Sequence, residues 1–153
     1  MNIRINSAEM NRTMKIINQC IDNIYENVEI IHDNNLLTVR GTNSVASAVV
    51  SMPLLGGDGS SFCVDGAMLT RVCANCKGEI EIISDDKVCT IKGAGRTRLP
   101  IVAKKVPAFT PVTGKSMTIQ GNSLIRCYGK VNYAVSTNQA RVNLTGVSVN
   151  ADS

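Results

Sequence analysis

Few residues in this chain have both the type and the spacing that covalent catalysis requires. His32 is the only histidine, and it falls in a predicted hairpin turn. Every Ser-His or Cys-His pair would therefore depend on one exposed position. Asp33, Asp85 and Asp86 also fall in predicted turns, where aspartate is common because its side chain hydrogen-bonds the local backbone. We expect no catalytic residue and hence no enzyme.

Cys73 and Cys76 have the Cys-x-x-Cys spacing of redox and zinc sites. They come at the end of a predicted helix and continue its apolar stripe, and no second pair lies nearby in the sequence. Core packing is therefore favoured over redox or metal chemistry. The sequence shows no secretory signal, which favours reduced thiols for its six cysteines. We expect a cytoplasmic protein with no metal and no cofactor.

The turn Gly93-Ala94-Gly95, followed by Arg96, is a candidate phosphate cradle. Phosphate loops place a glycine-rich turn at the start of a helix, where free backbone N–H groups point at the ligand. Here the turn is followed by Arg96–Val102, which predicts a strand. A structural turn is the favoured interpretation.

Charge is divided unevenly along the sequence. Residues 1–86 hold six Lys or Arg and eleven Asp or Glu, whereas residues 87–151 hold ten Lys or Arg and no acid. A long stretch of sequence that carries only positive charges favours a polyanionic partner, although many basic surfaces bind nothing in particular. Apolar runs are all too short to span a membrane, so we expect no membrane partner.

The positions of these residues depend on the elements that carry them. Asn2–Asn6 alternates apolar and polar residues as a half-buried strand does, and Ser7 is the expected N-cap of a helix reaching about Asp22. A hairpin follows with its turn at His32–Asn35, and Ser44–Pro53 predicts a third strand. The stripe expected to bury the helix is Met10, Met14, Ile17 and Ile21.

The same order of elements then starts again. Phe62–Val64 predicts a strand, Asp65 is the expected cap of a second helix, and Glu79–Ile91 predicts a second hairpin. The apolar side of this helix carries Met68, Leu69, Val72, Cys73 and Cys76.

The two hairpins match residue by residue at an offset of 52 positions. Matches in a single register imply a duplicated strand–helix–three-strand unit. The matched pairs are Val28 with Ile80, Ile30 with Ile82, Ile31 with Ile83, Asp33 with Asp85, Val39 with Ile91, and Gly41 with Gly93.

A third unit begins at Ser116. Met117–Gln120 predicts a strand, Asn122 a helix cap, and Val142–Val149 a further strand. The pattern stops before the hairpin partner that it requires, so we expect a piece of a longer, repeat-built protein. The apolar face predicted for the third helix is Leu124, Ile125, Tyr128 and Val131.

Each predicted helix carries two cations opposite its apolar side. If the helices lie side by side with the sheets outside them, these cations form one basic surface that suits contact with a phosphate backbone. Solvated helix faces that only keep the protein soluble are the alternative. The pairs are Arg12 and Lys15, Arg71 and Lys77, and Arg126 and Lys130.

Several stretches of the sequence together resemble one known family. They are Met1–Ile3 followed by Met10, Leu36–Asn43, Gly95–Pro100 followed by Val106–Pro111, and Ser136–Val147. The last, STNQARVNLTGV, is the most specific, since it is similar to the family's STDESRPVLTGV. The family is the bacterial sliding clamp, the β subunit of DNA polymerase III, and the likeness extends over the whole chain.

The resemblance implies an α+β fold, the DNA-clamp fold. In that fold β-α-β-β-β units repeat, with the helices on one face and antiparallel sheets outside. It also implies a first clamp domain at residues 1–112, with repeats at about 1–54 and 60–103, and the incomplete beginning of a second domain at 113–153.

The resemblance further implies a processivity factor of DNA replication that encircles duplex DNA as a homodimeric ring. DNA polymerase and a clamp loader would be partners of the full-length protein. In the family the helices line the DNA channel, so the six helix cations would face DNA, and Asn138 and Arg141 would join them by position. In the family the edge strand of the first domain contacts a partner subunit. The resemblance therefore implies that Leu99 and Ile101, with Val72 from the adjoining helix, lie at the subunit interface.

Two other readings stay open. The chain could be a basic nucleic-acid-binding module that forms no ring, or a Cys-x-x-Cys redox protein or small enzyme. The matches at offset 52 and the third unit favour the clamp over both.

Overall fold

The computed structural model describes residues 1–43, 45–103, 106–107, 113–114, 118–137 and 145–149. The chain forms two compact units, Met1–Thr110 and Pro111–Ser153, and each is described by itself. The elements of the first unit begin with β1 (Asn2–Asn6), α1 (Ser7–Ile17), the 3₁₀ turn Asn18–Cys20, β2 (Asn27–Asp33), β3 (Leu36–Thr42) and β4 (Ser47–Pro53).

The first unit continues through a second set of elements in the same order. These are β5 (Gly56–Asp58), β6 (Phe62–Asp65), α2 (Gly66–Ala74), β7 (Glu79–Ser84), β8 (Val88–Lys92) and β9 (Arg96–Pro100). The second unit contains α3 (Gly121–Val131) and the 3₁₀ turn Asn132–Ala134.

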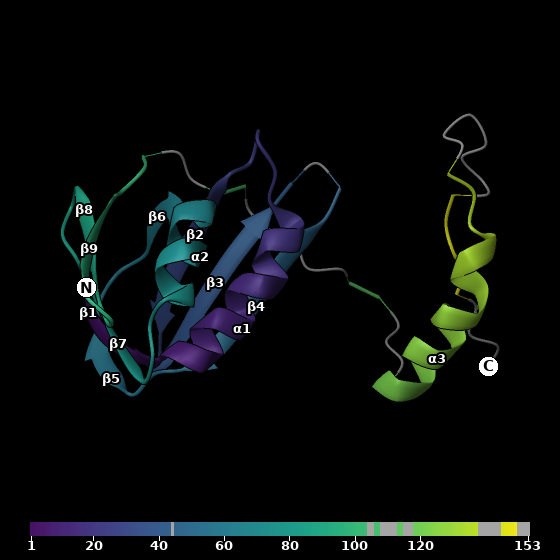
Figure 1. Cartoon of the computed structure of the whole chain (residues 1–153), viewed down its shortest axis with the longest axis horizontal. Helices are drawn as coiled ribbons and strands as arrows, with labels where there is room; N and C mark the ends of the chain where they lie inside the picture. Colours follow the sequence, from purple (N-terminus) through teal and green to yellow (C-terminus); the bar gives the residue numbers. More distant parts are fainter. Residues whose placement is uncertain (44, 104–105, 108–112, 115–117, 138–144, 150–153) are drawn as a thin grey trace. The chain divides into compact units, whose positions relative to one another are not determined.

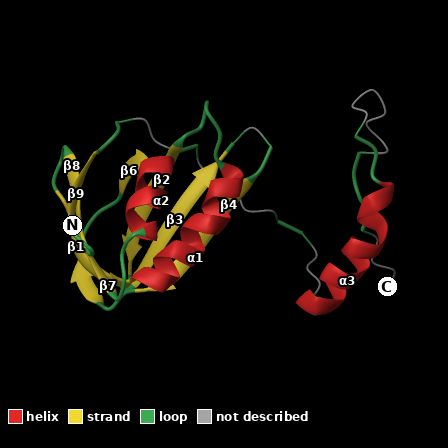
Figure 2. Cartoon of the chain, in the orientation of Figure 1, coloured by secondary structure: helices red, strands yellow, loops and turns green. Residues whose placement is uncertain are grey.

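Two antiparallel sheets form the first unit, and α1 and α2 lie side by side against them (Figure 1; Figure 2). Sheet A has the strand order β5-β1-β7-β8-β9, and sheet B has the order β4-β3-β2-β6. The first strand of each repeat pairs with the hairpin of the other repeat, β1 with β7 and β6 with β2. The two repeats are therefore interlocked.

The core between the helices and the sheets is aliphatic, as the scarcity of aromatic residues requires. Alternate strand positions such as Ile3 and Ile5 on β1 are fully buried, which is the period-two pattern of a half-buried strand. On the helices the buried stripe is Met10, Met14 and Ile17 of α1, and Leu69 and Cys73 of α2. The repeated β-α-β-β-β order, the antiparallel sheets and the helices on one face agree with the fold class expected from the sequence.

The duplication is present in the strand pairing. Ile30 pairs with Val39 in the first hairpin, and the residues 52 positions later, Ile82 and Ile91, pair in the second. Gly41 and Gly93 also share a role, because a Cβ on either would lie within 2.7 Å of a side chain at the end of the preceding helix (Ile17) or just after it (Cys76). The hairpin match at offset 52 is therefore confirmed in three dimensions.

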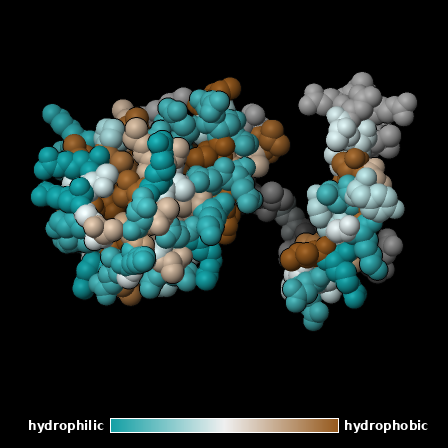
Figure 3. Space-filling view, in the orientation of Figure 1, coloured by the Kyte–Doolittle hydropathy of each residue, from teal (hydrophilic) through white to brown (hydrophobic). Residues whose placement is uncertain are grey.

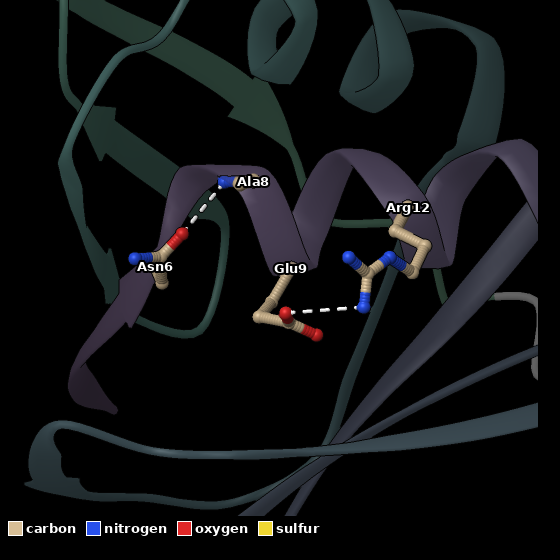
Figure 4. A network of polar contacts seen from close by, with 4 residues as sticks. All are labelled: Asn6, Ala8, Glu9 and Arg12. Carbon is tan, nitrogen blue, oxygen red and sulfur yellow. Dashed lines mark hydrogen bonds and ion pairs between the residues drawn. The ribbon is translucent and has the colours of Figure 1, made fainter.

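Several expected boundaries were wrong. The N-cap of α1 is Asn6 rather than Ser7: the Ala8 N–H donates to Oδ1 of Asn6 at 2.8 Å, and Ser7 is buried (Figure 4). The helix ends at Ile17 and tightens into a 3₁₀ turn instead of reaching Asp22. By contrast, Asp65 caps α2 as expected, accepting a hydrogen bond from the Met68 N–H at 2.6 Å.

The turn of the first hairpin is shorter than predicted. Only Asn34 and Asn35 form it, both with positive φ (44° and 65°), a conformation that asparagine tolerates better than most residues. His32 and Asp33 consequently belong to β2, where they pair with Leu37 and Leu36.

Other boundaries differ by a few residues. The third strand begins at Ser47 rather than at 44, which lies outside the described residues, and the strand after the glycine turn ends at Pro100 rather than Val102. In the second unit, α3 begins at Gly121, so Asn122 lies inside the helix instead of capping it. The described parts of the two strands predicted there, residues 118–120 and 145–149, are not in strands.

Candidate functional site

The exposed surface of α1 and α2 carries the cations that the sequence singled out. The buried stripe of α1 turns Arg12 and Lys15 outward, and both are exposed. Arg71 of α2 and Lys77, which follows that helix, are exposed as well. Polar residues dominate this face of the first unit (Figure 3).

The two helices are held next to each other at both ends. Where α1 ends and α2 begins, the Thr70 hydroxyl donates to Oδ1 of Asn18 at 3.1 Å. Where α2 ends and α1 begins, the Ser7 N–H donates to the Gly78 carbonyl at 2.8 Å. The helices therefore run in opposite directions, and Lys77 lies close to the start of α1.

Acidic residues limit the positive charge of this surface. Glu9 forms an ion pair with Arg12 at 3.3 Å, one turn along the helix (Figure 4). At the end where α1 stops and α2 starts, Asp22, Glu26 and Asp65 line one shallow pocket. The cations of the first unit suit weak, salt-sensitive contact with phosphates rather than tight binding.

The remaining candidates for the basic surface belong to the second unit. Arg126 and Lys130 lie on α3 and are exposed. The apolar residues of the same helix are exposed too: Leu124, Ile125, Tyr128 and Val131. Asn138 and Arg141 lie outside the described residues.

Strand β9 forms one edge of sheet A, as expected for the stretch after the glycine turn. Among the described residues it pairs only with β8. The Leu99 side chain is 4% exposed and packs in the core of its own unit, so the strand offers its backbone edge and the exposed Arg96, Thr97 and Arg98 to solvent. The interface role of Leu99 stays a prediction.

Two further residues were expected at the same seam. Val72 of α2 and Ile101, just after β9, are half-buried and pack against the core cluster. Ile101 also donates its N–H to the Lys87 carbonyl at 2.8 Å. Both residues lie near β9 in the fold, as a seam requires, and their interface role is likewise untested.

The cysteine pair is buried in the core of the first unit. Cys73 and Cys76 lie in the core cluster, which confirms the packing interpretation. Burial raises the pKa of the Cys73 thiol to about 12, and it raises the pKa of Cys89 to about 12 as well. Among the described residues, no group of three or more His, Cys, Asp or Glu side chains is placed to hold a metal ion.

Met68 of α2 departs from the predicted apolar side. It is 44% exposed, whereas its neighbour Leu69 is fully buried. A helix buried on one side accommodates Leu69 and Cys73, four residues apart, and turns Met68 a hundred degrees away.

Packing accounts for the glycine turn, and the histidine lies on a strand instead of in a turn. The Gly93 N–H donates to the Gly95 carbonyl at 3.0 Å, and a Cβ on Gly93 would lie 2.5 Å from Sγ of Cys76. Close packing, rather than a phosphate, accounts for this glycine. His32 was expected in an exposed turn, but its Nε2 is buried on β2.

Comparison with solved structures identifies the fold. The structure superposes on the DNA polymerase III subunit β from Pseudomonas aeruginosa with a TM-score of 0.86 at 17% identity, over 95% of this chain and 43% of that chain. Superposition on the Caulobacter crescentus pol III β gives a TM-score of 0.84 at 18% identity, over 95% of this chain and 42% of that chain. This chain has the fold of a bacterial sliding clamp.

A third sliding-clamp structure supports the same assignment. The Helicobacter pylori β clamp, bound in that structure to a DNA ligase peptide, gives a TM-score of 0.81 at 16% identity, over 92% of this chain and 42% of that chain. This chain thus spans about two fifths of the length of the clamp structures it matches. No protein-family model and no curated protein matches the sequence.

In the part of the chain that the structure describes, every helix is too short or too polar to traverse a bilayer.

Proposed function

We propose that this chain is part of a DNA sliding clamp, a processivity factor that holds duplex DNA by encircling it. The observation that carries the proposal is the superposition of 95% of the chain on a clamp subunit at a TM-score of 0.86. A ring retains DNA by topology, so weak phosphate contacts suffice, and the partly neutralised helix surface of Arg12, Lys15 and Arg71 suits that requirement.

Residues 1–112 would form the first clamp domain, and 113–153 the start of the second. The duplex would face the helices, contacted by the cations described above and by Asn138 and Arg141. The seam between subunits would use the edge of β9 that pairs with no other described strand, with Leu99, Ile101 and Val72 supporting it. DNA polymerase and a clamp loader would act on the whole protein, and two copies would close the ring.

Assembly tests this proposal. We expect light scattering of the whole protein that carries this chain to give a dimer mass, and negative-stain images to show a ring with a central hole. A monomer that binds circular and linear DNA equally well would contradict the proposal and indicate a basic module that forms no ring.

A further inference from the structure

Arg40 joins sheet B to the stretch of chain that leaves the first unit. Arg40 lies on β3 opposite Glu29 of β2, on the outer face of the sheet, because the alternate positions Val39 and Ile30 belong to the core. Its Nη2 donates to the Glu29 carboxylate and also to the backbone carbonyl of Val106, the latter at 3.3 Å. One guanidinium therefore links the strand pair to a residue 66 positions later in the chain.

The same stretch is held at its beginning by sheet B. The Val102 N–H donates to the carbonyl of Cys63 at 2.9 Å, and Cys63 pairs with Glu29 on the outer face. We call Ile101–Ala103 together with Val106 and Pro107 the exit segment. Cys63, Glu29 and Val106 are at most 9% exposed, so the exit segment and this part of the sheet shield one another.

The second repeat provides an internal comparison. Glu81 and Lys92 occupy the matching positions on β7 and β8, and their ion pair is 2.9 Å long. Their side chains are 33% and 44% exposed, against 11% for Glu29 and 20% for Arg40. The duplicated pair is shielded only in the repeat over which the exit segment passes.

Shielding an ion pair is a poor way to gain stability. Removing two charges from water costs free energy, and their attraction offsets that cost only if every donor and acceptor is hydrogen-bonded. Nε of Arg40 is buried without a hydrogen-bond partner among the described residues, so this pair is incompletely satisfied. What Arg40 provides instead is geometry, since its Nη2 alone donates to both the Glu29 carboxylate and the Val106 carbonyl.

We propose that Arg40, oriented by Glu29, is a positioning residue that fastens the exit segment to sheet B. It thereby fixes the point from which the chain leaves the first unit. Glu81 and Lys92 have no such role. The proposal concerns this chain's own fold and does not depend on DNA binding.

The test removes both charges at once, so that no unpaired charge stays buried. In the variant Glu29→Gln with Arg40→Met, we expect trypsin to cleave after Lys105 about tenfold faster than in the parent, because Val106 is released from the sheet. The midpoint of urea unfolding should stay close to that of the parent. The matched control, Glu81→Gln with Lys92→Met, should leave the cleavage rate unchanged.

A second variant covers the case in which the first one fails to fold. Arg40→Lys keeps the charge of the pair but lacks the planar guanidinium that places Nη2 between the Glu29 carboxylate and the Val106 carbonyl. We expect faster cleavage after Lys105 with little loss of stability. The proposal is overturned if folded Arg40 variants are cleaved at the parental rate, or if the control accelerates cleavage equally. The proposal is also overturned if cleavage is faster only in variants whose urea midpoint falls, because global unfolding would then explain the cleavage.

Discussion

Charge on the helix surface is decided residue by residue. Arg12 forms an ion pair with Glu9 across one helical turn, which partly neutralises its charge. Arg71 donates its Nε–H to the Ala67 carbonyl at 3.4 Å, and its charge stays exposed. An exposed ion pair of this kind is worth little to stability, so its effect is mainly on the local potential. Phosphate contacts by these side chains would be uniform along DNA and sensitive to salt.

If these arginines contact DNA as proposed, Arg12→Ala and Arg71→Ala should each weaken binding of the protein to duplex DNA and lower the slope of log K against log salt by about one, because each would remove one phosphate contact. Arg4→Ala is the matched control, since Arg4 lies on the outer face of sheet A and is exposed. Equal weakening by the control would show that only net charge matters.

The described thiols differ in exposure, and their reactivity should differ accordingly. Burial holds the Cys73 and Cys89 thiols protonated, with pKa values of about 12, whereas Cys127 on α3 is exposed. At pH 8, iodoacetamide should therefore modify Cys127 well before Cys73 or Cys89, because the thiolate is the reactive form. Peptide mapping by mass spectrometry would follow the order, and early modification of Cys73 under native conditions would contradict this account.

At the level of elements, the glycine turn shows how packing sets a residue choice. A Cβ on Gly93 would meet Sγ of Cys76 at 2.5 Å and its Cβ at 3.0 Å, whereas a Cβ on Gly95 would meet nothing within 4 Å. Neither glycine has a positive φ, so the difference between them is steric. The two positions form a matched pair within one turn.

We therefore predict that Gly93→Ala lowers the free energy of unfolding by about 1–3 kcal/mol, as overpacking does. Gly95→Ala should change the free energy of unfolding by less than about 0.5 kcal/mol, because its site is open. Urea titrations of the two variants would measure both values. Equal destabilisation would mean that the backbone conformation, rather than contact with Cys76, requires glycine in this turn.

Most elements could be predicted because their signals are local. The alternation in Asn2–Asn6 and the cap at Asp65 lie within a few residues of what they determine. The errors arose where two local solutions compete. Asn6 and Ser7 are both good N-caps, so either could begin the helix. The polar run His32–Asn35 predicted a four-residue turn, whereas Asn34 and Asn35 alone form it.

The pairing of the repeats could not be predicted from the sequence. Nothing local indicates that β1 joins β7, or that β6 joins β2, because strand exchange depends on contacts far apart in the chain. The residue-by-residue match of the two helices is missed by the offset of 52 for another reason. Met10, Met14 and Ile17 match Leu69, Cys73 and Cys76 in position, but the connection from helix to hairpin is shorter in the second repeat, so the offset differs from that of the hairpins.

Interlocking has a consequence for the first unit as a whole. Each sheet contains strands from both repeats, and one core cluster joins them. We predict that residues 1–110 unfold in one cooperative transition, with far-UV circular dichroism and hydrogen exchange giving the same midpoint in urea. Two separate transitions, one for each repeat, would contradict the observed strand pairing.

For the whole protein, the clamp proposal predicts that topology retains DNA. The cations of the helix surface are few and partly neutralised, so contact alone would release DNA quickly at moderate salt. The measurement is retention of the whole protein that carries this chain on nicked circular DNA during gel filtration, before and after one cut linearises that DNA. We expect the protein to stay with the circle and to be lost from the linear form, and equal retention on both would contradict the account.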